Sequence, residues 1–218
     1  MSNFVNYKIK SNKDKATFYT SSKEQLPGYI PVEVKDRGTF YHKAASNMTG
    51  TVERVFVKES KFGDTLDVWF KQPNEDIHVL SIPVWRTPTS LNDYLKEFVK
   101  LLPNISYGQE VNLWLNNKTK DKSGFLYKNM YAKSGEEKIE WAFTMEEIPR
   151  GEKSVNPITK KDQYSFEKNN AFFYEKLQEG ITKFDQNNPH KGQSDEQASI
   201  FEGVEDITED VPEEELVF

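Results

Sequence analysis

Between Gly50 and Thr144 the sequence alternates short β-type runs with turn residues and holds a single helical pattern. Strands are predicted where β-branched and aromatic residues alternate with polar ones between Gly, Pro, Asn or Asp. The predicted strands are residues 50–58, 65–71, 77–82, 110–116, 125–133 and 138–144. Closely spaced runs of this kind indicate a β-dominated core.

One helix is predicted between the third and the fourth of these strands. Ser90-Leu-Asn-Asp93 resembles a capping box, in which Ser90 caps the first turn and Asp93 reaches back. Apolar residues then recur at three- and four-residue spacing up to Leu102, and Pro103 ends the pattern. Three strands, a helix and two strands, with one extra strand, is the order of a five-stranded OB barrel. Other small β folds with one helix fit this order less well.

The rest of the chain is predicted to flank an OB-fold core of residues 50–145. Residues 1–49 are expected to be an N-terminal extension, an extended arm with at most one short strand that caps the core. Residues 146–186 form a C-terminal extension with an amphipathic helix over residues 166–184. Residues 187–218 are predicted to be a linker and a tail that is disordered when free, because little apolar surface offsets the entropy of ordering.

The charged residues are distributed unevenly along the chain. The whole sequence carries 29 Lys and Arg against 35 Asp and Glu, a net charge of −6. Ten of the acidic residues and none of the basic ones lie in residues 195–218, so this tail carries −10 and the remaining 194 residues carry +4. The protein is therefore predicted to be a basic body with an acidic arm, which is compatible with a nucleic-acid partner.

Composition and motifs argue against catalysis. The absence of Cys rules out disulfides, iron–sulfur clusters, thiolate zinc sites and cysteine nucleophiles, and the three His residues are far apart in the sequence. No Gly-rich phosphate loop ending in Lys-Ser/Thr and no G-x-S-x-G motif occurs. The acidic pairs Glu136-Glu137 and Glu146-Glu147 form no shared metal site, because neighbours on a strand point to opposite faces. The chain is predicted to be no enzyme and to need no metal or cofactor.

Targeting signals are also missing from the sequence. The N-terminus has no apolar signal-peptide region, and no apolar run reaches the ~18 residues that cross a bilayer. The protein is therefore expected in the cytoplasm, with no membrane partner.

Strand alternation predicts that two tryptophans point away from the core. In residues 65–71 every second residue is apolar, which leaves Trp69 on the polar face with Lys71. In residues 111–116 the same alternation leaves Trp114 between two asparagines. The alternative is that both rings pack under the N-terminal arm or the C-terminal helix.

A third strand adds another ring and more positive charge to this pattern. In residues 51–58, Arg54, Phe56 and Lys58 share one face, opposite two valines. Flat rings on a positive surface are typical of single-stranded nucleic acid sites, because bases stack on the rings and basic side chains bind phosphates. Each stacked base contributes about 1–3 kcal/mol. Taken together, the three strands favour stacking over a purely structural role.

Two loops carry basic residues at the positions that an OB fold uses for binding. The first loop holds Lys61 and Phe62, and the second is the run Asn116–Gly124 with its three lysines. A basic loop alone is more often solvated surface, but here both runs coincide with binding loops of the predicted fold. The predicted single-stranded DNA site comprises Arg54, Phe56, Lys58, Lys61, Phe62, Trp69, Lys71, Trp114, Lys118, Lys120, Lys122 and Tyr127.

The last six residues combine charge with an apolar end. Glu213-Glu214-Glu215 is followed by Leu216-Val217-Phe218, so a ring and the terminal carboxylate directly follow an acidic cluster. Such a segment docks as a short motif, with the ring in a pocket and the carboxylates on a basic rim. Solubility is the simpler role of an acidic tail, but it does not explain the apolar end. These residues are therefore predicted to bind partner proteins.

This arrangement resembles the replicative single-stranded DNA-binding proteins with an OB fold, in particular those of bacteriophages. The resemblance covers the order of elements over residues 50–144 and the acidic tail ending in Phe218. In the bacterial family such a tail recruits replication and repair proteins; this chain has Glu where Asp is usual and Val217 where Pro is common. The resemblance implies a protein that coats single-stranded DNA with little sequence preference and recruits partners through its tail.

Two functions are compatible with these patterns. In the first, the protein binds single-stranded DNA during replication, recombination or repair, in the host cytoplasm if the chain is viral, and its tail competes with DNA for the basic body. In the second, it is an adaptor whose barrel binds one protein and whose tail binds another. Only the first requires bases to stack on Trp69 and Trp114. The oligomeric state is left open between a monomer and a homo-oligomer.

Overall fold

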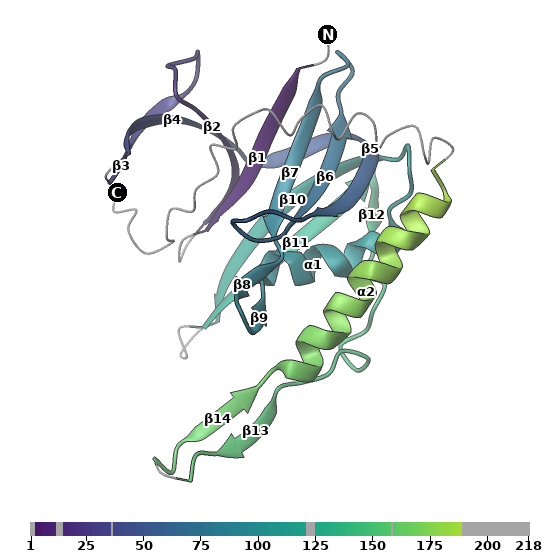
Figure 1. Cartoon of the computed structure of the whole chain (residues 1–218). Helices are drawn as coiled ribbons and strands as arrows, with labels where there is room; N and C mark the ends of the chain where they lie inside the picture. The colour runs from purple at the N-terminus through teal and green to yellow at the C-terminus, as the bar shows by residue number, and fades with distance from the viewer. Residues whose placement is uncertain (1–2, 12–14, 36, 121–124, 158, 189–218) are drawn as a thin grey trace.

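The computed structural model describes residues 3–11, 15–35, 37–120, 125–157 and 159–188. This part of the chain is mostly β, as predicted (Figure 1). One sheet has the strand order β12-β11-β10-β5-β6-β7-β1-β2-β4-β3. Its strands are β1 (Phe4–Ser11), β2 (Ala16–Ser22), β3 (Ile30–Val34), β4 (Gly38–Ala45), β5 (Asn47–Lys58), β6 (Thr65–Lys71), β7 (Ile77–Pro83), β10 (Glu110–Lys120), β11 (Phe125–Ser134) and β12 (Glu137–Ile139).

Two short hairpins and three helical segments accompany this sheet in the described ranges. The hairpins pair β8 (Trp85–Thr87) with β9 (Ser90–Leu91) and β13 (Glu152–Val155) with β14 (Asp162–Ser165). The helical segments are α1 (Asp93–Leu101), the 3-10 turn η1 (Leu102–Asn104) and α2 (Glu167–Gln186). Neither of the two described α-helices combines the length and the apolar character needed to cross a membrane.

The helix predicted between the third and fourth core strands is present as α1, but its cap differs from the prediction. Asn92 is the N-cap residue, and its Oδ1 accepts hydrogen bonds from the backbone N–H groups of Tyr94 at 2.9 Å and Leu95 at 3.4 Å. Ser90 does not cap the helix, because it belongs to β9 and pairs with Thr87.

The sheet differs from the five-stranded closed barrel expected from the sequence. The five strands of the predicted core lie in the order β11-β10-β5-β6-β7, and ten strands are joined in all among the described residues. There, β7 pairs with β1 and β11 pairs with β12, rather than β7 with β11. Since β1 satisfies the backbone groups on the free edge of β7, that edge does not pair with β11. Helix α1 contacts both β7 and β11.

The N-terminal segment is not the predicted arm with at most one short strand. Strands β1 to β4 all join the sheet beyond β7. β1 first pairs in parallel with β7, from Phe4↔Ile77 onward, and then antiparallel with β2, from Lys8↔Tyr19 onward. The prediction was wrong because the partner of β1 lies far along the chain, and local alternation does not identify such a partner.

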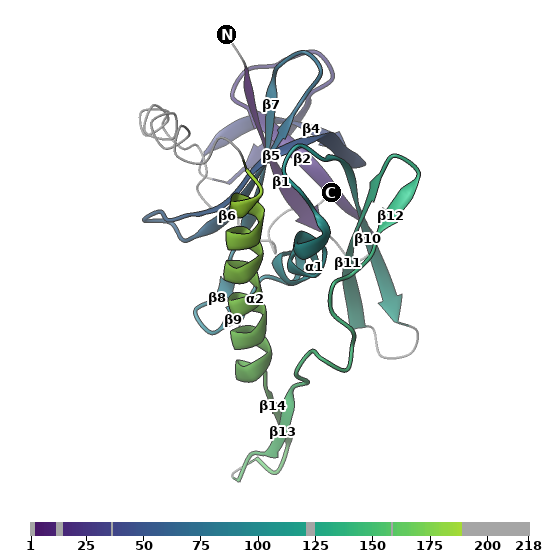
Figure 2. The same ribbon diagram turned by 90° about the vertical axis from the view of Figure 1, so that its right-hand side faces the viewer.

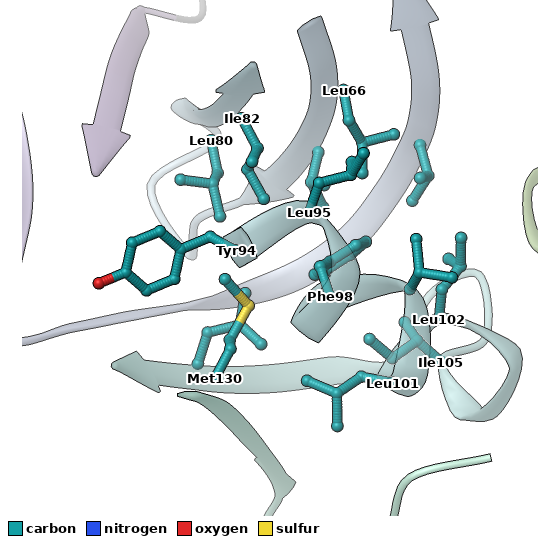
Figure 3. Close-up of a cluster of buried hydrophobic side chains, with 14 of the residues drawn as sticks. Leu66, Leu80, Ile82, Tyr94, Leu95, Phe98, Leu101, Leu102, Ile105 and Met130 are labelled. Carbon is teal, nitrogen blue, oxygen red and sulfur yellow. The ribbon is translucent and has the colours of Figure 1, made fainter. Parts of the chain in front are cut away.

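The hydrophobic core lies between α1 and the sheet. Figure 3 shows Leu95 and Phe98 of α1 among side chains that include Leu66 of β6 and Ile82 of β7, and all four are fully buried. Phe18 of β2 is buried in the same cluster. The N-terminal strands therefore share one core with the rest of the sheet, and the other face of the sheet points away from it.

The C-terminal extension contains the predicted helix and an additional hairpin. α2 begins and ends within two residues of the predicted 166–184 helix. The strand predicted over residues 138–144 ends at Ile139, and the Ala142 N–H then donates to the Lys100 carbonyl of α1 at 2.8 Å. The β13–β14 hairpin projects from the body at the N-terminal end of α2, as Figures 1 and 2 show.

Gly180 lies where α2 packs on η1, and this packing generates a prediction. A Cβ at this position would lie 2.7 Å from Cδ2 and 2.9 Å from Cγ of Leu102, which is itself buried. We expect Gly180→Ala to lower the free energy of unfolding in urea, because overpacking costs about 1–3 kcal/mol and the gain in helix propensity is only about 1 kcal/mol. Gln178→Ala, at an exposed position of α2, is the control. A stabilised Gly180→Ala variant would contradict the packing.

His78 makes the stability of the fold depend on pH. Its ring lies 5.2 Å from that of Tyr7, and burial lowers its pKa, with an opposing effect of Asp76 and a further lowering by Lys43. The unfolded chain therefore takes up this proton more readily, so stability present above about pH 6.5 is lost as the pH falls through the folded pKa. We expect the melting temperature to fall less in His78→Gln than in wild type between about pH 7.5 and pH 5. Equal falls in the two proteins would refute this coupling.

Candidate nucleic-acid interface

The outer face of β5 and β6 brings three of the predicted site residues together. The register places Arg54 opposite Trp69 and Phe56 opposite Asp67, so these side chains leave the sheet on the face opposite to Val55 and the core. The Arg54 guanidinium carbon lies 4.9 Å from the Trp69 ring centroid and 5.1 Å from that of Phe56. The two rings meet edge to face, with centroids 6.0 Å apart. Strand alternation predicts this shared face correctly.

A fourth side chain, from the N-terminal strand β1, completes this group. Phe4 of β1 packs edge to face on Trp69, with ring centroids 5.2 Å apart. It arrives there because β1 pairs with β7, which in turn pairs with β6. Sequence reasoning missed Phe4 because nothing in a short N-terminal run identifies the strand with which it pairs. Phe4, Arg54, Phe56 and Trp69 are called the aromatic cluster below.

Trp69 carries an unsatisfied polar atom within this cluster. Its side chain is half-buried, and its Nε1 is buried with no hydrogen-bond partner in the described structure. A buried indole N–H usually has an acceptor. This nitrogen is shielded from solvent, so the cluster offers flat ring surface rather than an exposed indole donor. The aromatic cluster thus combines stacking surface with one positive charge.

The turn between β5 and β6 extends this face with an exposed ring and basic residues. Phe62 is 45% exposed, and the Lys61 ammonium lies 4.9 Å from its ring centroid. The Ser60 hydroxyl shapes the turn, since it accepts from the Phe62 N–H at 3.2 Å and donates to the Gly63 carbonyl at 2.7 Å. Lys58 is the last residue of β5 and lies on the same face as Phe56. Lys58 and Lys61 therefore lie at the end of the strand that holds Arg54 and Phe56.

Lys71 lies on the same outer face but is paired with acidic side chains. Its Nζ is 2.5 Å from a carboxylate oxygen of Glu75 and 3.9 Å from one of Glu53. The hydrogen bond to Glu75, together with the charges of Glu53 and Glu75, raises the pKa of Lys71. The charge of Lys71 is therefore largely compensated within the protein, whereas Arg54 lies over both rings of the cluster, where a phosphate next to a stacked base would lie.

Trp114 belongs to a second group of rings. It stacks on Tyr131 of β11, with centroids 5.8 Å apart and 25° between planes, and Tyr131 stacks on Trp141 at 6.4 Å and 13°. The Lys100 ammonium lies 4.5 Å from the Trp141 ring centroid, and Trp141 packs against the hydrophobic core. This stack is anchored in the core at one end, which gives Trp114 a structural role of its own.

The two tryptophans predicted to form one site are well separated. Trp114 pairs opposite Asn47 of β5, whereas Trp69 pairs opposite Arg54 of the same strand. At about 3.3 Å per residue, seven residues of β5 place the two positions about 23 Å apart along the strand. The structure therefore does not bring Trp69 and Trp114 into one aromatic patch.

The second predicted binding loop is shorter than the sequence indicates. Lys118 pairs opposite Tyr127, and strand pairing between β10 and β11 continues to Lys120, so these residues are strand rather than loop. Tyr127 is 39% exposed. Lys122 and the tail residues 213–218 lie outside the described part of the chain.

The start of the second predicted loop is also fixed by a polar contact between three elements. Asn117 of β10 accepts a hydrogen bond from the Tyr94 hydroxyl of α1 at 2.8 Å and donates one to the Ser11 hydroxyl of β1 at 2.9 Å. The amide of Asn117 thus joins α1, β10 and the end of β1, which explains why an Asn occurs at this position within a strand.

The most buried acidic residue that the structure describes on α1 is used in an ion pair. Glu97 and Lys100 of α1 form a buried, hydrogen-bonded ion pair. Burial raises the pKa of Glu97, and the charge and hydrogen bond of Lys100 oppose that shift. No group of three or more His, Asp or Glu side chains within the described ranges could hold a metal ion.

Comparison with protein-family models, with curated proteins and with solved structures gives no match. The aromatic cluster and the neighbouring β5–β6 turn are the surface on which the predicted stacking residues and basic residues actually meet.

Proposed function

We propose that the protein binds single-stranded DNA without strong sequence preference, during replication or recombination. The observation that carries the proposal is the contact of Arg54 with Trp69 and Phe56 on the outer face of the sheet. Rings of this kind stack on any base, and the guanidinium binds the phosphate that follows it. The lysines of the β5–β6 turn continue the positive surface along the strand.

The order of strands supports the same proposal. β11-β10-β5-β6-β7, with α1 between the third and fourth of these strands in the chain, is the strand order of an OB barrel. OB folds bind oligonucleotides on the face of their second and third strands and with the adjoining loops. In chain order β6 is the second of these five strands, and the aromatic cluster lies on β6, on its neighbour β5 and on β1. The proposed barrel differs from the simple OB fold in having β1 beside β7.

The acidic tail has two proposed roles alongside DNA binding. Its final residues Glu213–Phe218 would recruit replication or recombination proteins through a short motif. Its charge of −10 would also compete with DNA for the body, which carries +4. Both roles rest on the sequence.

An adaptor function is the second candidate, and one observation favours it. The β13–β14 hairpin projects from the body and exposes Val155 and Tyr164, and Phe166 follows it as the N-cap residue of α2; each of the three is more than half exposed. Exposed apolar residues on an isolated hairpin are typical of a protein-binding surface. An adaptor would bind proteins through this hairpin and its tail, and would not need the aromatic cluster.

Titration of the full chain with labelled oligo-dT, followed by polarisation and by tryptophan fluorescence, tests the proposal. Wild type is expected to bind with quenching, and Trp69→Leu is expected to bind at least fivefold more weakly by polarisation, since stacking contributes about 1–3 kcal/mol per base. Trp85→Leu is the matched control, because Trp85 stacks on Tyr174 of α2 rather than on the aromatic cluster. Absence of binding by wild type would reject DNA binding, and equal binding by both variants would remove the aromatic cluster from the site.

A pair of charge variants tests which basic residue meets the phosphates. Arg54→Gln is expected to reduce the slope of log K against log salt by about 0.7, which corresponds to roughly fivefold weaker binding at about 0.1 M salt. Lys71→Gln removes the same charge from the same face, but Glu53 and Glu75 already compensate it, so its slope should stay close to that of wild type. A larger loss in Lys71→Gln than in Arg54→Gln would contradict this assignment.

A further inference from the structure

The positive charge of the body is concentrated in its N-terminal segment. Residues 1–49 contain eight Lys and Arg and four Asp and Glu, whereas residues 50–194 contain 21 of each. The excess of +4 that remains without the acidic tail therefore comes entirely from residues 1–49. Because residues 50–194 carry no net charge, a DNA site confined to β5 and β6 would gain no net electrostatic attraction from the rest of these residues.

Strands β1, β2 and β4 place part of this charge on the same face as the aromatic cluster. Phe4 and Lys8 are four residues apart on β1, so they point to the same side and lie about 13 Å apart along the strand. Lys8 pairs opposite Tyr19, and Ser21 pairs opposite His42. Because alternate residues of a strand share a face, Lys8, Tyr19 and His42 lie on that side as well.

The side chains on this face are close enough to act together. The Tyr19 and His42 rings lie 5.0 Å apart with 36° between planes. Burial lowers the pKa of His42, and the charges of Lys10 and Lys8 lower it further. His42 is therefore neutral at pH 7 and presents an uncharged flat ring beside two lysines. Lys8, Lys10, Tyr19 and His42 are called the N-terminal cluster below.

The opposite face of the same strands is used for the core. Phe18 of β2 is fully buried, and Ala16 and Ala45 pack against the core from the neighbouring positions. The N-terminal cluster therefore points away from the core. Core packing does not explain why two lysines and two rings occur together on that outer face.

We propose that the N-terminal cluster is a second subsite for the same DNA strand, continuous with the aromatic cluster through β1. Lys8 and Lys10 bind phosphates, and the Tyr19 and His42 rings support a base. The inference rests on the proposed function and adds to it that the strand runs from β5 and β6 across β1 onto β2 and β4. The N-terminal strands then supply most of the net positive charge of the interface.

Single-stranded DNA fits this surface better than an acidic peptide does. Carboxylates of a peptide would pair with Lys8 and Lys10 but would gain little from two adjoining rings. A nucleotide uses both features, because its phosphate binds the lysines while its base lies on a ring. Phe4 of the aromatic cluster and Lys8 of the N-terminal cluster share one face of β1, which favours one ligand that crosses both clusters.

The test compares a short and a long oligo-dT on the full chain. An oligonucleotide of about six residues is near the lower limit for one OB fold, and one of about 25 residues exceeds the upper limit. Residues 1–49 contain no Trp, so tryptophan quenching by the short oligonucleotide does not report on the N-terminal cluster, and the part of the quenching that Trp69→Leu loses reports on the aromatic cluster. Polarisation of the labelled long oligonucleotide reports on both clusters.

The double variant Lys8→Gln/Lys10→Gln is expected to affect only the long oligonucleotide. Loss of two phosphate contacts should lower the salt slope by about 1.4 and weaken binding roughly 25-fold at about 0.1 M salt. Quenching by the short oligonucleotide should stay within about twofold of wild type, because Trp69 is untouched. Lys138→Gln/Lys153→Gln removes the same charge from exposed residues on β12 and β13 and is the matched control.

The outcomes separate this inference from the proposed function. If wild type binds the short oligonucleotide and Lys8→Gln/Lys10→Gln matches the control, the second subsite is wrong and the aromatic cluster stands. If wild type binds neither oligonucleotide, both proposals fail. A Tyr19→Leu variant that binds the long oligonucleotide like wild type, with poly-glutamate competing as well as DNA, would assign the surface to an acidic polypeptide and overturn the inference.

Discussion

The parallel pairing of β1 with β7 is the constraint on which the rest of the structure depends. It satisfies the backbone edge of β7 that a closed five-stranded barrel would pair with β11, and it joins four N-terminal strands to the central sheet. Phe4 reaches Trp69 only through this pairing. The contact of Asn117 with Ser11 holds the far end of β1 against β10, so the strand is fixed at both ends.

Because of this arrangement, one face of the sheet packs the hydrophobic core and the other face carries the rings and basic residues. The inner face packs against α1 around Leu95 and Phe98, and Phe18 of β2 belongs to the same hydrophobic core. α2 then packs closely at Gly180, where a side chain would collide with Leu102. The rings and basic residues of β5, β6, β1 and β2 named above point to the outer face, which is the surface proposed to bind DNA.

Predictions from local patterns succeeded where the signal was local. Alternation in residues 65–71 placed Trp69 opposite the core, and the helical spacing up to Leu102 identified α1. The prediction that Ser90 caps α1 was wrong, because Ser90 pairs with Thr87 in a hairpin and Asn92 is the N-cap residue. Trp114 lies on the predicted strand, on the face opposite to Leu113 and the core, but it stacks with Tyr131 of a neighbouring strand and is separate from Trp69.

The sequence by itself determined the β-dominated class, the two α-helices, the uneven charge and the faces of individual strands, because each follows from residues within a few positions of one another. Only the tertiary structure decided which faces meet. The partners of β1, the meeting of Phe4 with Arg54 and Trp69, and the pairing of Lys71 with Glu53 depend on contacts between distant segments. Such contacts are selected by the packing of the whole sheet, for which a single strand carries no local signal.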